Sequence, residues 1–305
     1  MDGIIVINKP YGATSHQVVQ SVRRLFQGIK AGHSGTLDPA ATGVLPVCLG
    51  KATRIAEYII EHPKTYRAAV TLGITTDTED AAGRKTGQFA VPGIDQVQIE
   101  QILSGFIGNI EQLPPLYSAV KYRGKPLYHW TRSGKDVPRR VRLADIYSIE
   151  LLEFNDDREA QIIFDVQCSK GTYIRTLAAD IGRAVGCGAH LFSLTRLAVG
   201  PFKLEKSLTL EKVAELARSN CYEEFLLPMD TALVHFPKLK LEDKHIKALK
   251  NGQTVCLDHL GLSGQFRIND KIRIYDTRNN FKAIACWEQS ATGNRLKTSK
   301  YLSDG

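Results

Sequence analysis

One carboxylate, Asp38, lies in a loop of small residues, GHSGTLDPAATG at positions 32–43, with His33 five positions before it. Glycines and other small residues allow another chain or a ligand to approach the backbone closely. An aspartate before a proline is typical of a turn. The same carboxylate can instead act as a nucleophile or a general base. The loop by itself leaves both interpretations open.

A basic segment at positions 121–142 contains eight Lys or Arg residues and one acidic residue. Such a run is typical of a solvated, flexible surface. Here Tyr122, Tyr128 and Trp130 interrupt it, and this mixture of charge with stacking surface is typical of nucleic-acid contacts. The candidate phosphate contacts are Lys121, Arg123 and Lys125.

The composition agrees with a globular chain that has a polyanionic partner. With 40 Lys and Arg against 32 Asp and Glu, the formal net charge is +8, which favours nucleic acid as the partner. Hydrophobic residues make up 43% of the chain, too many for a disordered protein. A length of 305 residues predicts a large domain together with a small one.

The six cysteines are scattered, and none forms a C-x-x-C pair. This pattern predicts buried free thiols in a reducing compartment, without a structural zinc or disulfides. The apolar run at residues 4–7 is too short for a signal peptide or a membrane span. The sequence therefore predicts a soluble, cytoplasmic protein with no membrane partner.

Hydrophobic periodicity predicts the elements that must carry the Asp38 loop. A buried strand at residues 4–7 ends before Pro10, and Thr14 or Ser15 is expected to cap the next helix. Downstream of the loop we expect strands at 44–49 and 66–72, helices at 52–60 and 99–107, and a polar loop at 77–87.

The second half of the sequence predicts one more pair of long strands, followed by a change to short strands and turns. Strands are expected at 162–168 and 191–202, separated by a helix that Gly186 ends, and another helix is expected at 210–217. After Pro228 the pattern becomes short strands and turns, including a hairpin of residues 271–275 with 282–287. This predicts a small β module with a boundary near residue 235.

Several long motifs, in order over residues 1–230, resemble one family: the bacterial tRNA pseudouridine synthases of the TruB type, which modify the T-loop uridine. A single G-x-x-D-P loop would be weak support, whereas a set of ordered motifs is strong. The matching motifs are Asn8-Lys9-Pro10, GHSGTLDPAATGVLPVCLGKATR (32–54), Lys64-Thr65-Tyr66, LPPLYSAVKYRGKPLY (113–128), KGTYIRTLAADIG (170–182) and LTRLAVGPF (194–202).

The resemblance assigns catalytic roles to three residues. It implies that Asp38 is the catalytic nucleophile, that Tyr66 stacks on the target base and can transfer a proton, and that Arg175 forms an ion pair with Asp38. Burial would raise the pKa of the Asp38 carboxyl. We expect the Arg175 guanidinium to reverse that effect, because arginine stays charged and forks onto a carboxylate.

The resemblance also implies a substrate-binding set. His33 helps to hold the extruded T-loop nucleotides, and Lys9 belongs with Pro10 to a structural motif beside the substrate. Tyr173 and Leu197 match positions near the base.

The fold implied by the resemblance is α+β. Residues 1–235 would form the catalytic domain, with a mixed, largely antiparallel central sheet and flanking helices. Residues 236–305 would form a small β-rich, PUA-like RNA-binding domain. The implied reaction isomerises the uridine at tRNA position 55 after base flipping and needs no cofactor or metal. The implied partner is the T-arm of tRNA, bound by a monomer without an obligatory protein partner.

Two alternatives stay open at this point. The first is a guide-dependent pseudouridine synthase of a ribonucleoprotein, although the first predicted strand at residue 4 leaves little of the extra N-terminal sequence usual in that branch. The second is a non-catalytic tRNA-folding or RNA-binding protein. A zinc-dependent base deaminase is excluded, because its H-x-E and P-C-x-x-C motifs are missing.

Overall fold

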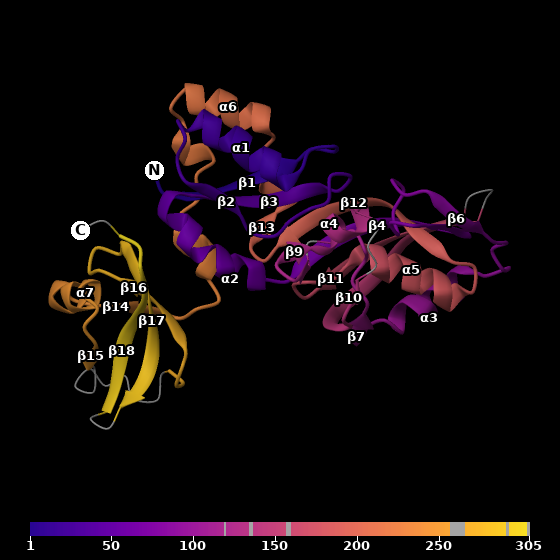
Figure 1. Cartoon of the computed structure of the whole chain (residues 1–305). Coiled ribbons are helices and arrows are strands. Elements are labelled where there is room, and N and C mark those ends of the chain that lie inside the picture. Colours follow the sequence, from indigo (N-terminus) through magenta and orange to yellow (C-terminus); the bar gives the residue numbers. More distant parts are fainter. Residues whose placement is uncertain (119, 134–136, 157–159, 257–265, 291–292, 304–305) are drawn as a thin grey trace.

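The computed structural model of the chain describes residues 1–305 except 119, 134–136, 157–159, 257–265, 291–292 and 304–305. Figure 1 shows a large body built on one sheet and a smaller β-rich body formed by the C-terminal segment. None of the helices in the described part of the chain has both the length and the apolar content needed to cross a bilayer.

The large body contains a nine-stranded sheet in the order β1-β3-β12-β4-β11-β10-β7, with β2 on β3 and β13 on β12. Every pairing is antiparallel except that of β12 with β3. This confirms the mixed, largely antiparallel sheet. The strands are β1 (Gly3–Lys9), β2 (Ala31–His33), β3 (Thr42–Leu49), β4 (Lys64–Leu72), β7 (Gly108–Gln112), β10 (Arg142–Asn155), β11 (Gln161–Cys168), β12 (Ala189–Val199) and β13 (Phe202–Lys203).

Helices cover this sheet, and two small hairpins lie beside it (Figure 1). The hairpins pair β5 (Ile74–Thr76) with β6 (Lys85–Gln88), and β8 (Lys121–Tyr122) with β9 (Lys125–Pro126). The α-helices of the large body are α1 (Ser15–Leu25), α2 (Ala56–Glu61), α3 (Gln96–Ser104), α4 (Leu127–Arg132), α5 (Ile174–Val185) and α6 (Leu210–Arg218). The short 3-10 helices are η1 (Gly50–Ile55), η2 (Leu204–Lys206), η3 (Tyr222–Glu224) and η4 (Met229–Leu233).

Local sequence signals explain the two helices nearest the Asp38 loop. At the start of α1, Thr14 and Gln17 form a reciprocal capping box that satisfies two otherwise free backbone donors. At the end of α5, Gly186 adopts a φ of 91°, a left-handed conformation that glycine takes without steric cost. The apolar face of α5 packs on β4 and β11 in the main core, where Leu177 and Phe164 are fully buried.

The small body contains a five-stranded sheet in the order β14-β16-β17-β18-β15, with its own buried core. The elements are β14 (Lys238–Lys240), α7 (Asp243–Lys250), β15 (Val255–Cys256), β16 (Lys271–Tyr275), β17 (Phe281–Ser290) and β18 (Gly293–Tyr301). The expected hairpin is present as β16 and β17, turning at Asn279 with a φ of 68°. The sheet packs on the large body around α2, where the Tyr58 ring meets Phe236 edge-on with ring centroids 5.5 Å apart.

The structure differs from the sequence expectations in several elements. The helix expected at 52–60 is the 3-10 helix η1 followed by the short α2, the polar loop at 77–87 gives way to β6 at Lys85, and α7 was not predicted. The six cysteines are all described and none forms a disulfide, but Cys256 is exposed, and Cys221 and Cys286 are only partly buried. The expectation of six buried thiols is therefore wrong for these three.

The parallel contact between β3 and β12 is short and depends on Gly43. It consists of two residue pairs, one of which places Gly43 beside Arg196. Gly43 has a φ of +101°, and a Cβ added there would lie 2.2 Å from the carbonyl oxygen of Arg196. Any side chain at this position would force the two strands apart.

We predict that Gly43→Ala destabilises the protein more than Gly12→Ala does. Gly12 also has a positive φ, +82°, but a Cβ there would meet no atom within 4 Å. The unfolding free energy that Gly12→Ala loses should therefore reflect backbone strain alone, about 1–2 kcal/mol. Urea unfolding of the two variants measures the difference. Equal losses of unfolding free energy would contradict the tight β3–β12 contact.

Candidate active site

The loop that carries Asp38 connects β2 to β3, and polar side chains of Ser15 and Lys9 hold it in place. The Ser15 hydroxyl accepts a hydrogen bond from the backbone N–H of Leu37 at 2.9 Å. The Lys9 ammonium donates to the carbonyls of Pro10, Ala13 and Pro39 at 2.9, 2.7 and 3.2 Å. These contacts hold both sides of Asp38 against the start of α1.

Lys9 therefore has a different place from the one the sequence analysis gave it. Its side chain is fully buried, and its three N–H donors are directed at three backbone carbonyls. Burial lowers the pKa of Lys9 to about 8. A side chain enclosed in this way supports the loop and cannot contact a bound RNA.

Asp38 forms an ion pair with Arg175 from the first turn of α5. The Arg175 Nε lies 3.0 Å from the Asp38 Oδ2. Arg175 is only 6% exposed, whereas the Asp38 side chain is 46% exposed and faces a pocket. The carboxylate is thus held by a buried cation and still open to a ligand.

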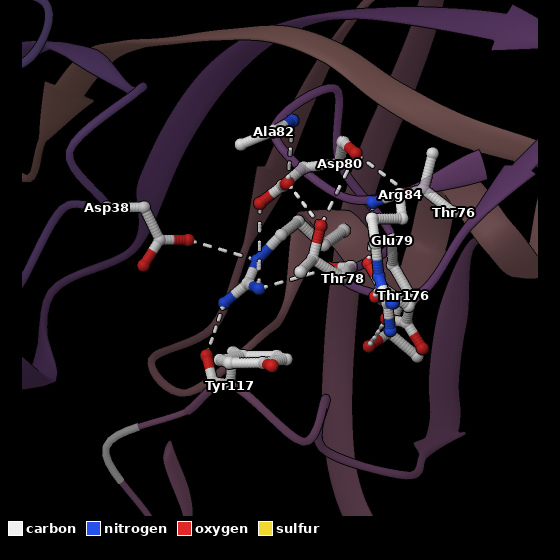
Figure 2. A network of polar contacts seen from close by, with 11 residues as sticks. Asp38, Thr76, Thr78, Glu79, Asp80, Ala82, Arg84, Tyr117 and Thr176 are labelled. Carbon is white, nitrogen blue, oxygen red and sulfur yellow. Dashed lines mark hydrogen bonds and ion pairs between the residues drawn. The ribbon is translucent and has the colours of Figure 1, made fainter. Parts of the chain in front are cut away.

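The remaining donors of Arg175 are bound to two other segments. NH1 donates to the Thr78 carbonyl at 3.2 Å, and NH2 donates to the Tyr117 carbonyl at 2.9 Å. NH1 also lies 3.7 Å from the Asp80 carboxylate. Figure 2 shows Asp38, Thr78, Asp80 and Tyr117 converging on this guanidinium from three directions.

Burial dominates the electrostatics of Asp38. The pKa of its carboxyl is raised, first because burial disfavours the charged form, and further because the Asp80 carboxylate repels it. The guanidinium of Arg175 and the ammonium of Lys9 oppose this shift without overcoming it. Our expectation that Arg175 would reverse the effect of burial is therefore wrong. Arg175 limits the rise.

The pocket beside Asp38 is walled by side chains from β4, α5 and β12. Tyr66 of β4 is buried and lines it, as do Tyr173 at the N-terminal end of α5 and Leu194 of β12. The structure thus brings Asp38, Tyr66, Arg175 and Tyr173 together, as the sequence analysis expected of them. The remaining lining includes Gly35, Thr36, Leu37, Ile60, Lys64, Ser118, Lys170 and Arg196.

Two other candidates lie away from this pocket lining. His33 is the last residue of β2, where it pairs with Val47, and burial lowers the pKa of its imidazole. Leu197 lies at a β-bulge between Arg196 and Ala198, and neither it nor His33 lines the pocket. Leu194, three residues earlier on β12, lines the pocket instead.

Sequence reasoning missed two buried cations that line the pocket, Lys64 and Arg196. They belong to motifs that we quoted, but an Arg or Lys inside a strand is usually assigned to the surface. Arg196 is 1% exposed, and its Nε donates to the Val44 carbonyl at 2.7 Å. The usable signal was a basic residue among the apolar positions of an otherwise buried strand.

The basic segment begins with an exposed hairpin. Lys121, Arg123 and Lys125 of β8, β9 and their turn are all exposed. The Arg123 guanidinium lies 5.4 Å from the centroid of the Tyr122 ring, and the Lys125 ammonium lies 5.9 Å from that of Trp130. The Tyr128 side chain and residues 134–136 lie outside the described part of the chain. The described surface therefore combines cations with aromatic rings.

A metal site is not formed by the described residues, among which no group of three or more His, Cys, Asp or Glu side chains is placed to hold an ion. The chemistry available at the pocket is that of one accessible carboxylate beside a buried guanidinium, with a tyrosine in the wall.

Comparison with protein families gives two adjoining matches. Residues 23–174 match the N-terminal domain of the TruB family of pseudouridylate synthases, and residues 175–234 match the tRNA pseudouridylate synthase B C-terminal domain. The two matches meet at the start of α5, and strand β12 of the second pairs with β4 of the first. They therefore describe a single folded sheet.

Relatives with similarity over most of the chain bear one name. A tRNA pseudouridine synthase B of Chromohalobacter salexigens is 45% identical over 87% of this chain and 85% of its own length. That of Geobacillus thermodenitrificans is 47% identical over 84% of this chain and 86% of its own.

Among solved structures, a chain in an H/ACA RNP bound to a substrate RNA containing 2′-deoxyuridine superposes with a TM-score of 0.75. It is 26% identical to this chain, and the match covers 99% of this chain and 85% of the other.

We predict that Asp80→Asn lowers the pKa of Asp38. The substitution removes a carboxylate that repels Asp38 and competes with it for the charge of Arg175, so the ionised form of Asp38 becomes more stable. Titration of the aspartate carboxyls by carbon-13 NMR measures the shift. Asp77→Asn is the matched control, since Asp77 lies on the same loop but bonds Arg84. An unchanged or higher Asp38 pKa in Asp80→Asn would contradict this electrostatic picture.

Proposed function

Because the chain belongs to the TruB family of pseudouridylate synthases, we propose that it converts the T-loop uridine of tRNA, at position 55, to pseudouridine by means of Asp38. The observation that carries the proposal is the ion pair that holds the Asp38 carboxylate at an open pocket beside Tyr66 and Tyr173. The enzyme class follows from the family, and the position and the role of Asp38 are the proposed part.

The reaction moves a bond within one nucleoside. The C1′–N1 glycosidic bond breaks, the uracil turns, a C1′–C5 bond forms, the proton leaves C5 and N1 gains a proton. No atom or electron is gained overall, so we propose that the reaction needs no cofactor. Asp38 can attack the base, attack the anomeric carbon, or deprotonate the sugar. The position of its carboxylate beside the pocket suits each of these routes.

The uracil must leave the folded RNA to enter this pocket. Extrusion costs a few kcal/mol in lost stacking and pairing. A ring such as that of Tyr66 in the pocket wall recovers about 1–3 kcal/mol by stacking on the base. We therefore assign Tyr66 to holding the extruded base, with Tyr173 and Leu194 completing the wall.

We place the RNA backbone along the β8–β9 hairpin. The segment that leads to this hairpin also touches the site, because the Tyr117 carbonyl binds Arg175 and Ser118 lines the pocket. An RNA phosphate on Lys121, Arg123 or Lys125 would thus lie on a segment continuous with the catalytic group. Residues 236–305, with a core of their own, are proposed as an auxiliary, PUA-like RNA-binding domain beside a catalytic domain of residues 1–235.

A guide-dependent enzyme is the second candidate, since a chain of an H/ACA RNP shares the fold over nearly the whole length. The relatives of 45 and 47% identity are instead named tRNA pseudouridine synthase B. We favour a monomer that acts alone on tRNA. Incubation of the isolated protein with an unmodified tRNA transcript, without any guide RNA, distinguishes the two by mapping pseudouridine.

We predict that Asp38→Asn abolishes pseudouridine formation and leaves the Kd for tRNA within a few fold. The amide has nearly the shape of the carboxylate but lacks its charge and nucleophilicity. Single-turnover assays with a filter-binding control measure both quantities on the same preparation. Robust turnover by the variant would remove Asp38 from the chemistry.

We predict that replacing Lys121, Arg123 and Lys125 by alanine weakens tRNA binding and reduces its salt dependence. Each lost phosphate contact should reduce the slope of log K against log salt by about 0.7–0.9. Removing three exposed cations of η2 and α6 (Lys206, Lys212 and Arg218) is the matched control, and Figure 1 shows α6 away from β9 of the hairpin. If both triple variants keep the original slope, the RNA does not follow the hairpin.

A further inference from the structure

The active-site pocket contains more positive than negative charge. Among the described residues that line it, four are cationic (Lys64, Lys170, Arg175 and Arg196) and one, Asp38, is a carboxylate. Two of these cations have an acidic partner in the structure. Arg175 pairs with Asp38 at 3.0 Å, and the exposed Lys170 pairs with Glu61 at 2.5 Å. The other two do not.

Lys64 and Arg196 are buried cations, 6% and 1% exposed. Within the described residues, no carboxylate lies at ion-pair distance from either of them. The Lys64 ammonium donates to the carbonyls of Ile60 and His62, and the Arg196 guanidinium donates to those of Val44 and Gly35. Buried charges are usually paired, because taking an isolated charge out of water is costly. The arrangement thus carries positive charge without a protein counter-ion.

Both cations lie next to the place where the base is expected. Lys64 and Tyr66 are two residues apart on β4, so their side chains point to the same face of the sheet. Arg196 is paired directly with Tyr66 across β4 and β12. Burial raises the pKa of the Tyr66 hydroxyl, and the positive charge of the neighbouring Arg196 opposes that shift. The two cations therefore flank the tyrosine that we assign to holding the uracil.

We infer that Lys64 and Arg196 stabilise the negative charge that develops on the uracil while its glycosidic bond is broken. The inference rests on the proposed function of the same pocket. When the C1′–N1 bond breaks, its electron pair stays on N1 and spreads over O2 and O4 of the ring. Fixed positive charges in a site shielded from water act strongly on such a developing anion and need no rearrangement at the moment of reaction.

An RNA phosphate is a poorer counter-ion for this pair. Side chains that are 6% and 1% exposed leave little surface for a bulky, hydrated phosphate. The exposed cations of the β8–β9 hairpin are accessible to phosphates instead. A flat base that enters the pocket approaches Lys64 and Arg196 without bringing a phosphate with it.

The test compares two leaving groups in the full-length enzyme. Unmodified tRNA transcripts carry either uridine or 5-fluorouridine. Because fluorine at C5 leaves no proton to be lost there, the quantity measured for both is the single-turnover rate at which the target nucleoside is consumed by C1′–N1 cleavage, at saturating RNA. Fluorine withdraws electrons and stabilises the uracil anion, so the rate should depend less on electrostatic stabilisation of that anion by the protein. We expect Lys64→Met to lower the rate with uridine about 10²-fold, the usual scale for removing one electrostatic stabiliser. With 5-fluorouridine, the loss of rate should be at least five times smaller. Lys64→Arg, which keeps the charge, should show the wild-type ratio of the two rates.

Lys170→Met is the matched control, because it removes an exposed and paired cation from the same pocket. Any loss of rate that it causes should be the same for both substrates. If Lys64→Met fails to fold by circular dichroism, Arg196→Gln is judged by the same ratio.

Three results would overturn the inference. An equal loss on both substrates means that Lys64 only supports the structure. A wild-type rate at saturating RNA means that it does not act in the chemical step. A change confined to the Kd and its salt dependence means that the cation binds a phosphate. Failure of the wild-type enzyme to form pseudouridine in the uridine transcript would instead refute the proposed function itself.

Discussion

The ion pair between Asp38 and Arg175 joins four separate segments of the chain at one point. Arg175 comes from the start of α5, and its guanidinium binds the Asp38 carboxylate, the Thr78 carbonyl and the Tyr117 carbonyl at the same time. The Asp38 loop, the β5–β6 connection and the segment before the β8–β9 hairpin therefore depend on one buried side chain. These contacts connect each of the segments to the Asp38 carboxylate through the Arg175 guanidinium.

The same site balances opposing electrostatic effects. Burial and Asp80 raise the pKa of Asp38, whereas Arg175 and Lys9 lower it, so the carboxyl is more basic than an ordinary aspartate and still paired with a cation. A carboxylate with this balance is less stabilised as an anion than a surface aspartate, which favours proton transfer or attack. Burial also lowers the pKa of Lys64 to about 8, with the repulsion of Arg196 second. In this pocket, burial thus disfavours the charged forms of both Asp38 and Lys64.

The sequence predicted the parts of this site that follow local rules. The small-residue loop around Asp38, the strand of Tyr66 and the helix that begins beside Arg175 could be located from motifs and periodicity. Long-range packing decided the rest. Leu197 was expected near the base, but it lies at a β-bulge of β12, and Leu194 lines the pocket instead. The burial of Lys9 depends on carbonyls up to thirty positions away. Lys64 and Arg196 lie among apolar residues of their strands, which was the available signal, but only the packing shows that their charges lie in the interior.

The most direct test of this account is the single-turnover rate of Arg175→Gln on unmodified tRNA, measured at saturating RNA together with the Kd. Glutamine removes the charge that holds Asp38, and a misplaced or protonated carboxylate should cost about 10²-fold or more in rate. The account predicts this loss with the Kd within a few fold and the protein folded by circular dichroism. A folded Arg175→Gln enzyme that forms pseudouridine at the wild-type rate would contradict the central place of the ion pair.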